Sequence, residues 1–279
     1  VEVTGFDAIT RVAGLSDDTV NDALLELLRE EFPIHMGAAA AVSAKADGVE
    51  IRSGETTVVV DRVLTALGRR PNLDGLGLDS FGVELDERGM PPLDTTTMQI
   101  GDLPVFLAGD ANGHAAVLHE AADEGRIAGL NAVTEESRCF QRRTPLGIVF
   151  GDPGAAFVGR RFAELEAGEA VVGEVRFERQ GRARAALRNK GVMRIYAASP
   201  SGRLLGAEMC APSSEHMAHL LALAVDRQLT VADLLRMPFY HPVLEEGMRT
   251  ALRDLARQLP RLSDSDLAAC DAFEVEALD

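Results

Sequence analysis

The sequence predicts an α/β region followed by an α+β module. In the first half of the chain, helical apolar patterns are interspersed with short apolar strand patterns. A polar and charged stretch at 135–143 then marks a domain boundary. Beyond it, several strand patterns are followed by two long helical ones, which is typical of an α+β module. With 279 residues, the chain can bury one large core or two ordinary ones.

Composition excludes several classes of protein. The 28 basic and 44 acidic residues leave a net charge of −16, which disfavours binding to the phosphate backbone of nucleic acids. No apolar run is long enough to suggest a membrane span. Cys139, Cys210 and Cys270 are far apart and show no metal-ligand spacing, so we expect free thiols in a cytoplasmic protein and no metal site.

The first 62 residues contain one helical pattern among short strand patterns. The alternation Val1-Glu2-Val3 predicts an opening strand, and Ser16-Asp17-Asp18 supplies capping side chains for a helix. Because the chain starts in mid-strand without an initiator Met, we expect that upstream sequence has been lost. Further strands are expected at Ile34, Val42, 49–51 and 58–60, with Asp47-Gly48 as a hairpin turn.

The next region contains two apolar runs and a helix rich in small residues. Residues 63–67 and 104–108 predict buried strands, and a helix is expected over 118–133. The second run ends at Gly109-Asp110, and ligands of open α/β sheets bind beyond the carboxyl ends of strands. Asp110 is therefore a candidate acceptor for the hydroxyl groups of a polyol; alternatively, it caps the following helix.

The second half begins with strand patterns and ends with helical ones. Expected strands lie at 147–150, 174–179, 183–187, 192–197 and 204–209, and expected helices at 214–227 and 244–259. Just before the last helix, His241 is followed by Pro242, and Glu246 falls in the first turns of the helix. Histidine suits proton transfer near neutral pH, and Glu246 can reach back to orient one ring nitrogen. Alternatively, His241 is an ordinary loop residue.

Two segments resemble the pyridine nucleotide-disulfide oxidoreductases. Residues 105–110 with 116–125 are similar to the second flavin-binding stretch of that family. Residues 67–72 are similar to the segment in which the chain of that family returns from the nicotinamide domain to the flavin domain. The resemblance implies that Gly109, Asp110, Ala116, Val117, Leu118 and His119 contact FAD, and that Gly68 lies near the nicotinamide cofactor, NAD(P). A helix N-terminus beside the flavin stabilises negative charge on it.

The segment from Tyr240 to Glu246 is similar to the His-Pro-x-x-x-Glu signature of the same family. The resemblance implies that His241 exchanges a proton with a thiol of a dithiol substrate while Glu246 holds it, and that the pair serves the flavin and redox disulfide of the other subunit of a homodimer. The sequence most resembles dihydrolipoamide dehydrogenase. Two residues depart from those enzymes: Phe239 stands where they usually carry another His, and Gly154 stands where an acidic residue usually follows the Pro.

The resemblance also implies a domain order. Incomplete Rossmann-like parts for NAD(P) (1–62) and FAD (63–142) precede an α+β dimerisation domain (143–260) and an acidic tail (261–279). Neither the family's C-x-x-x-x-C redox pair nor a G-x-G-x-x-G motif occurs in the sequence, so we expect the chain alone to be inactive and colourless. The alternatives are a non-catalytic dimerisation module, or a parent enzyme that is glutathione reductase-like or transhydrogenase-like.

Overall fold

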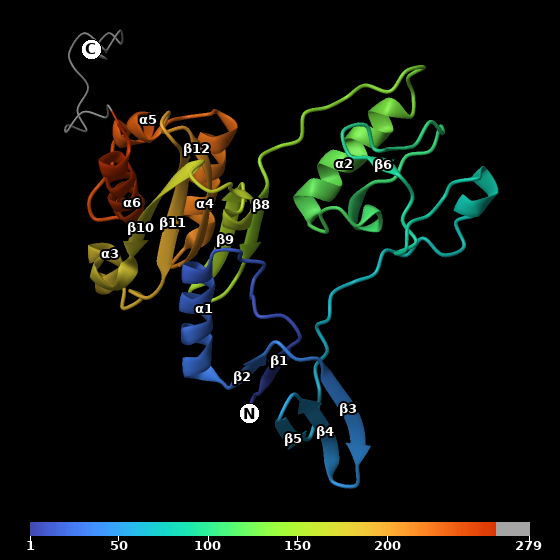
Figure 1. The fold of residues 1–279 in the computed structure, drawn as a ribbon, viewed down its shortest axis with the longest axis horizontal. Helices are drawn as coiled ribbons and strands as arrows, with labels where there is room; N and C mark the ends of the chain where they lie inside the picture. Colours follow the sequence, from blue (N-terminus) through green and yellow to red (C-terminus); the bar gives the residue numbers. More distant parts are fainter. Residues whose placement is uncertain (261–279) are drawn as a thin grey trace. The chain divides into compact units, whose positions relative to one another are not determined.

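The computed structural model describes residues 1–260. The described residues fold into two compact units, a larger unit formed by 1–63 together with 144–260, and a smaller unit formed by 64–143 (Figure 1). The acidic tail expected at 261–279, and Cys270 within it, lie outside the described residues.

A five-stranded antiparallel sheet forms the centre of the larger unit. Its strands follow the order β10-β11-β12-β9-β8, and every residue of β12 is buried. Since β12 is the middle strand, it pairs with both β11 and β9 along its length. The bounds are β8 (Leu146–Val149), β9 (Gly154–Gly159), β10 (Ala170–Arg176), β11 (Val192–Ala198) and β12 (Leu204–Ala211).

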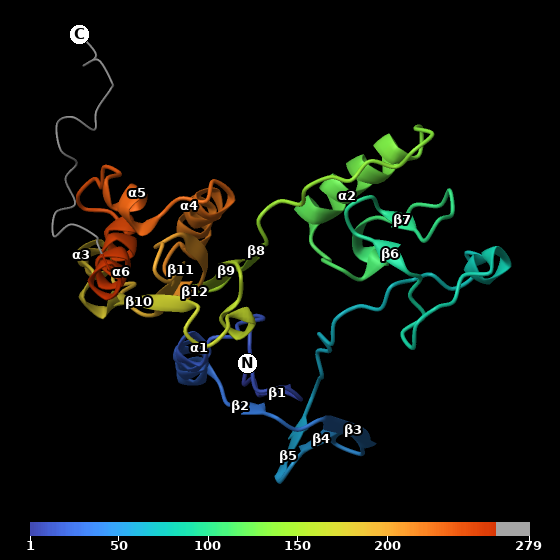
Figure 2. The ribbon, with the colours of Figure 1, turned by 45° about the horizontal axis from the view of Figure 1, so that its top comes forward.

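Three helices cover one face of this sheet (Figures 1 and 2): α4 (Ser214–Asp226), α5 (Val231–Leu235) and α6 (Glu245–Gln258). Helix α6 is strongly amphipathic and buries Met248, Ala251, Leu252 and Leu255 against the sheet. At Gly173 of β10 a Cβ atom would lie 2.2 Å from the carbonyl oxygen of Ala251, so the absence of a side chain there permits the close approach of α6.

Helix α1 (Asp18–Glu31) packs on the opposite face of the same sheet. Successive strand residues point to opposite faces, and while Met209 contributes to the core under α4 and α6, its neighbour Cys210 packs with Leu15, Val20 and Leu24 of the α1 segment. The helix begins after Asp17, whose side chain accepts a hydrogen bond from the backbone N–H of Thr19.

A buried polar network fastens this helix to the sheet. The carboxylate of Glu208, in the middle of β12, accepts hydrogen bonds from the backbone N–H groups of Ser16 (2.6 Å), Asp17 (3.0 Å) and Phe162 (3.0 Å). Asp17 in turn accepts from the hydroxyl of Tyr196 at 2.9 Å. Burial, with the charges of Glu208 and Asp17, raises the pKa of Tyr196, which keeps the hydroxyl protonated as a donor.

The remaining strands of the larger unit come from its N-terminal part. Strand β1 (Gly5–Asp7) pairs in parallel with β2 (Ile34–Met36). An antiparallel meander follows, made of β3 (Ala40–Lys45), β4 (Gly48–Ser53) and β5 (Thr56–Val60).

The smaller unit contains little regular structure apart from one long helix. Strands β6 (Leu93–Asp94) and β7 (Gln99–Ile100) form a short hairpin, and two 3-10 turns occupy η1 (Leu78–Phe81) and η2 (Gly109–Asn112). Helix α2 (Leu118–Asn131) is the long helix, and a compact apolar cluster gathers around Ile100.

Most elements expected from apolar spacing are confirmed, including α1, β2 to β5, α2, β8, β10 to β12, α4 and α6. Two of the expected buried strands are absent. Residues 63–67 are non-helical coil with Leu64 and Leu67 more than 90% exposed, and 104–108 form only a single bridge at Phe106. An apolar run needs neighbouring strands to become a buried strand, and within residues 1–260 the only strand partner of either run is β7, which bridges to Phe106 through Gln99.

Two further strand expectations are wrong. The stretch expected at 183–187 instead belongs largely to helix α3 (Gly181–Ala185), because its Arg and Ala residues favour helix and Gln180 caps it by accepting from the N–H of Ala183. The opening strand at 1–3 is coil, and pairing starts at Gly5, where β1 meets β2. The hairpin turn expected at Asp47-Gly48 lies one residue earlier, since Gly48 already pairs with Lys45.

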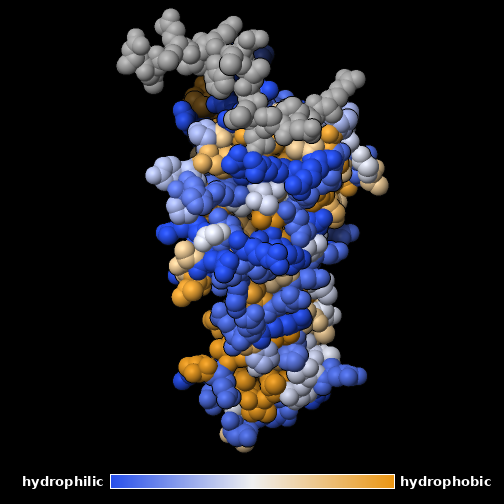
Figure 3. All heavy atoms as spheres, turned by 90° about the vertical axis from the view of Figure 1, so that its left-hand side faces the viewer, coloured by the Kyte–Doolittle hydropathy of each residue, from blue (hydrophilic) through white to orange (hydrophobic). Residues whose placement is uncertain are grey.

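The face of the molecule in Figure 3 is mostly hydrophilic, with hydrophobic residues scattered among hydrophilic ones. Amphipathic helices explain this distribution within the larger unit, because the apolar residues of α1 and α6 are turned towards the sheet.

Candidate active site

The side chains of His241 and Glu246 lie in direct contact at the start of α6. The ring Nδ1 of His241 is 2.9 Å from one carboxylate oxygen of Glu246 and 3.1 Å from the other. Because a carboxylate only accepts hydrogen bonds, Nδ1 carries the proton, and Nε2 is the nitrogen left for proton exchange. The His241 side chain is 78% exposed and that of Glu246 is 29% exposed, so a substrate can reach the ring while its partner is largely shielded.

The carboxylate of Glu246 is itself held by the backbone. One of its oxygens accepts from the N–H of Val243 at 3.1 Å. The hydrogen bond from His241 is the main cause that lowers the pKa of Glu246, and the Val243 N–H and the charges of His241 and Arg249 act in the same direction against the effect of burial. Glu246 therefore stays ionised and keeps its hold on the ring at neutral pH.

Packing at the first turn of α6 sets the position of this pair. Gly247 lies against the ring of the buried Phe177, which a Cβ atom at Gly247 would approach to 3.1 Å. The guanidinium of Arg249 lies 5.5 Å from the centroid of the Phe239 ring, within the range of a cation–π contact. The start of α6 thus packs against Phe177, and Arg249 connects the helix to Phe239, two residues before His241.

Gly109 and Asp110 lie in the turn η2 of the smaller unit. Gly109 has a φ of +73° and is buried, a conformation that favours glycine. Asp110 does not cap α2, since the N-cap of that helix is Val117; the alternative role expected for Asp110 is therefore wrong. Asp110 instead pairs at 3.2 Å with Arg69, and both side chains are well exposed.

Ala116, Val117, Leu118 and His119 form the exposed start of α2. No side chain caps the helix, so the N–H groups of its first turn have no side-chain acceptor. Gly68, with a φ of +83°, lies in exposed coil, and no atom comes within 4 Å of the position a Cβ would take. In the smaller unit, Gly109, Asp110 and 116–119 thus lie at the turn η2 and the start of α2. Gly68 does not belong to this group and lies in exposed coil.

Glu124 is a residue that sequence reasoning missed. Its fully buried carboxylate accepts from the N–H of Gly109 at 2.8 Å and from the side-chain amide of Asn112 at 2.7 Å. Arg142 donates to the same carboxylate at 3.0 Å. The signal was present, because Glu124 falls on the small-residue face of the helix, three residues after Ala121 and four before Ala128.

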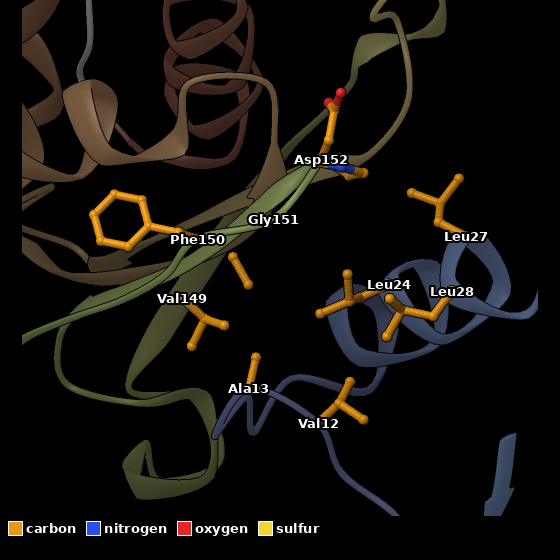
Figure 4. A pocket seen from close by; sticks show the side chains of 11 residues that line it. Val12, Ala13, Leu24, Leu27, Leu28, Val149, Phe150, Gly151 and Asp152 are labelled. Atoms are coloured by element: carbon orange, nitrogen blue, oxygen red, sulfur yellow. The ribbon is translucent and has the colours of Figure 1, made fainter. Parts of the chain in front are cut away.

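Other parts of the described chain offer less chemistry. An apolar hollow of about 190 Å³ lies between α1 and the β8–β9 connection (Figure 4). Among its lining residues only Asp152 is ionisable.

Residues 1–260 contain no cluster of His, Cys, Asp or Glu suited to a metal, and no helix long and apolar enough for a membrane span. Cys139 is exposed and Cys210 buried, and both are free; burial raises the pKa of Cys210 to about 11.

Comparison with protein-family models assigns most of the chain. Residues 1–125 match the pyridine nucleotide-disulphide oxidoreductase model, and residues 146–252 match the dimerisation domain of the same family. Similar curated proteins include dihydrolipoyl dehydrogenase of Bacillus subtilis, 31% identical over 221 residues, which are 76% of this chain and 46% of that protein. The enzyme of Thermus scotoductus is 29% identical over 267 residues, 92% of this chain and 57% of the relative.

Solved structures give the same result for the fold. The Cu(II) complex of the HOCl-induced flavoprotein disulfide reductase RclA from Escherichia coli superposes with a TM-score of 0.79 at 23% identity, over 90% of this chain and 58% of that one. LpdA from Mycobacterium tuberculosis gives 0.78 at 26% identity, with 91% and 56% covered. The chain spans about half the length of the curated relatives it matches. The expected fold class is confirmed, and the chain belongs to the pyridine nucleotide-disulfide oxidoreductase family.

Proposed function

We propose that this chain supplies the acid–base half of the active site of an FAD-dependent dithiol/disulfide oxidoreductase of the dihydrolipoamide dehydrogenase kind. The observation that carries the proposal is the hydrogen bond between His241 Nδ1 and the Glu246 carboxylate at 2.9 Å. Relatives named dihydrolipoyl dehydrogenase support the substrate class.

The proposed proton path uses the two nitrogens of one ring. Glu246 holds Nδ1–H and so leaves Nε2 as a base, which takes the proton of a substrate thiol and later returns it. As the imidazolium forms, its positive charge is stabilised by the adjacent carboxylate, which stays ionised because its pKa is lowered. The substrate thiolate that results is the reactive form for disulfide exchange.

The proposed cofactors are FAD and NAD(P). When bound, FAD would carry electrons between the dithiol substrate and the nicotinamide ring of NAD(P). Asp110 offers a carboxylate to hydroxyl groups of the FAD chain, Gly109 lets the backbone approach it, and the uncapped first turn at Ala116, Val117, Leu118 and His119 offers N–H groups to an anion. These groups fit one side of a flavin pocket. Gly68 is proposed to lie near nicotinamide, and the parts at 1–62, 63–142 and 143–260 are proposed as NAD(P), FAD and dimerisation domains.

The proposed assembly is a homodimer formed through residues 144–259, in which His241 serves the flavin of the other subunit. The match of 146–252 to a dimerisation domain supports it. A cytoplasmic location, with no nucleic acid or membrane as partner, belongs to the same proposal.

A second candidate function is a non-catalytic dimerisation module. One observation favours it, since the sequence contains neither C-x-x-x-x-C nor G-x-G-x-x-G. The purified chain decides between the two for this molecule: flavin absorbance with diaphorase activity supports the enzyme, and a colourless dimer supports the module. A parent of the glutathione reductase or transhydrogenase kind is the alternative substrate assignment.

The role of His241 is tested by His241→Gln in a full-length flavoenzyme that contains this sequence. We expect turnover of dihydrolipoamide to fall by about 100-fold or more while bound flavin is unchanged, because general acid–base catalysis contributes on that scale. Equal losses of turnover and flavin would show that His241 is a structural residue. His219→Gln, on the exposed surface of α4, is a matched control.

A further inference from the structure

Gln180 connects the turn before α6 to the start of α3. Its side chain is 8% exposed, which is unusual for a glutamine and calls for partners on both ends of the amide. The oxygen accepts from the N–H of Ala183 at 2.6 Å, and the nitrogen donates to the carbonyl of Val243 at 2.6 Å. One amide group thus bridges the start of α3 and the segment that follows His241.

The bridge continues to the His241–Glu246 pair through the backbone of a single residue, Val243, and through a carboxylate. Val243, whose carbonyl is held by Gln180, uses its own N–H to donate to Glu246, and Glu246 accepts from His241. The contacts measure 2.6, 3.1 and 2.9 Å along the chain Gln180, Val243, Glu246, His241. Every contact in this chain has a defined donor and acceptor.

The exposure of the residues increases along the same route. Gln180 is buried, the Glu246 side chain is 29% exposed, and that of His241 is 78% exposed. A ring so open to water has few packing contacts to fix its orientation, so the orientation depends on Glu246 and, through Val243, on the buried amide. We infer that Gln180 is a positioning residue for the His241–Glu246 pair. This inference rests on the proposed role of His241.

Two variants separate the bridge to Val243 from the cap on α3. Gln180→Glu keeps an oxygen acceptor for Ala183 but loses the donor to Val243, and faces that carbonyl with another acceptor. Gln180→Met keeps the approximate side-chain length and removes both hydrogen bonds. Gln258→Glu is the matched control, because Gln258 donates in the same way to a backbone carbonyl, that of Val172 at 2.8 Å, away from His241.

The measurement is the tautomer of His241 by ¹⁵N NMR of the histidine-labelled 279-residue chain above the pH at which the ring is charged. The His241→Gln spectrum assigns the signal. We expect the wild type to hold the Nδ1–H form, Glu246→Ala to lose it, and both Gln180 variants to move at least halfway towards Glu246→Ala, with Gln258→Glu unchanged. If Gln180→Met fails to fold, Gln180→Glu decides alone.

A wild-type tautomer in a folded Gln180→Glu chain would overturn the inference and leave Gln180 as a cap of α3 only. This outcome is independent of the proposed function, because it requires no turnover. In the full-length enzyme, Gln180→Glu is expected to lower kcat several-fold with KM within twofold. A full-length His241→Gln enzyme that stays active would refute the proposed function while the tautomer result stood.

Discussion

The turn before α6 and the turn before α2 both carry candidate functional residues, but the chain builds them to different degrees. At the first, His241 and Glu246 hold each other at 2.9 Å, and the backbone beside them is tied to a buried amide. At the second, Asp110 pairs with an exposed arginine, and the residues of the helix start are open to solvent. The chain therefore brings His241 and Glu246 together by itself, whereas it supplies only one side of the proposed cofactor site.

The difference follows from what lies beneath each turn. Helix α6 buries four residues completely, Met248, Ala251, Leu252 and Leu255, and each large one stabilises the fold by about 1.5–3 kcal/mol. Helix α2 buries only one apolar residue, Ile127, beside the polar Glu124 and Asn131. A helix that buries many apolar residues fixes the positions of the side chains it carries, whereas a helix that buries few leaves them more mobile.

The largest loss of stability is expected for Glu208→Ala, in the larger unit. This change removes the acceptor of one buried and two half-buried backbone N–H groups, and we expect the free energy of unfolding of the larger unit to fall by about 3–5 kcal/mol. Chemical denaturation measures it, with the exposed Glu178→Ala as control. A loss below about 1 kcal/mol would mean that the network does not fasten α1 to the sheet.

Glu124→Ala tests the turn before α2, where the expected loss of stability is smaller. Without this carboxylate the N–H of Gly109 and the amide of Asn112 lose their acceptor, and we expect a local loss of about 2–3 kcal/mol. Hydrogen exchange at Gly109 should accelerate, while exchange in β12 stays unchanged. The neighbouring Asp123→Ala, which removes only a partly exposed ion pair with Arg143, should leave Gly109 unaffected.

The smallest expected effect is a pH dependence at Glu246. Its pKa in the folded chain is below the ordinary value of 4.5, so the folded state binds fewer protons there than the unfolded state. The resulting stability is fully present above pH 4.5 and is lost as the pH falls through the folded pKa. The contribution is at most about 1 kcal/mol, because the pair is near the surface.

Unfolding midpoints measured between neutral pH and pH 3 check this dependence. We expect Glu246→Gln to be less stable than the wild type at neutral pH and equally stable in acid. Glu245→Gln, one residue earlier on α6, is the control. A difference that grows towards acid would contradict the direction of the pKa change.

Sequence patterns sufficed where a segment carries its own periodicity and cap. The spacing around Met248 and the distance from His241 to Glu246 predicted both α6 and the contact made at its start. Patterns failed at 63–67 and 104–108, since a uniformly apolar run becomes a strand only when other strands pair with it. Gln180 was missed because its partners are backbone groups, one of them 63 residues away, which side-chain spacing does not reveal. The spacing that placed Glu124 on the small-residue face of α2 likewise does not reveal its partners Gly109, Asn112 and Arg142.

The most direct test is to measure bound flavin and the His241 Nδ1 proton on the same purified 279-residue chain. We expect no flavin absorbance in the visible range, together with a protected Nδ1–H shared with Glu246 that disappears in Glu246→Ala. A stoichiometric flavin, or a His241 proton that exchanges between Nδ1 and Nε2 in the folded chain, would contradict the claim that this chain builds the proposed acid–base pair on its own and the proposed flavin site only in part.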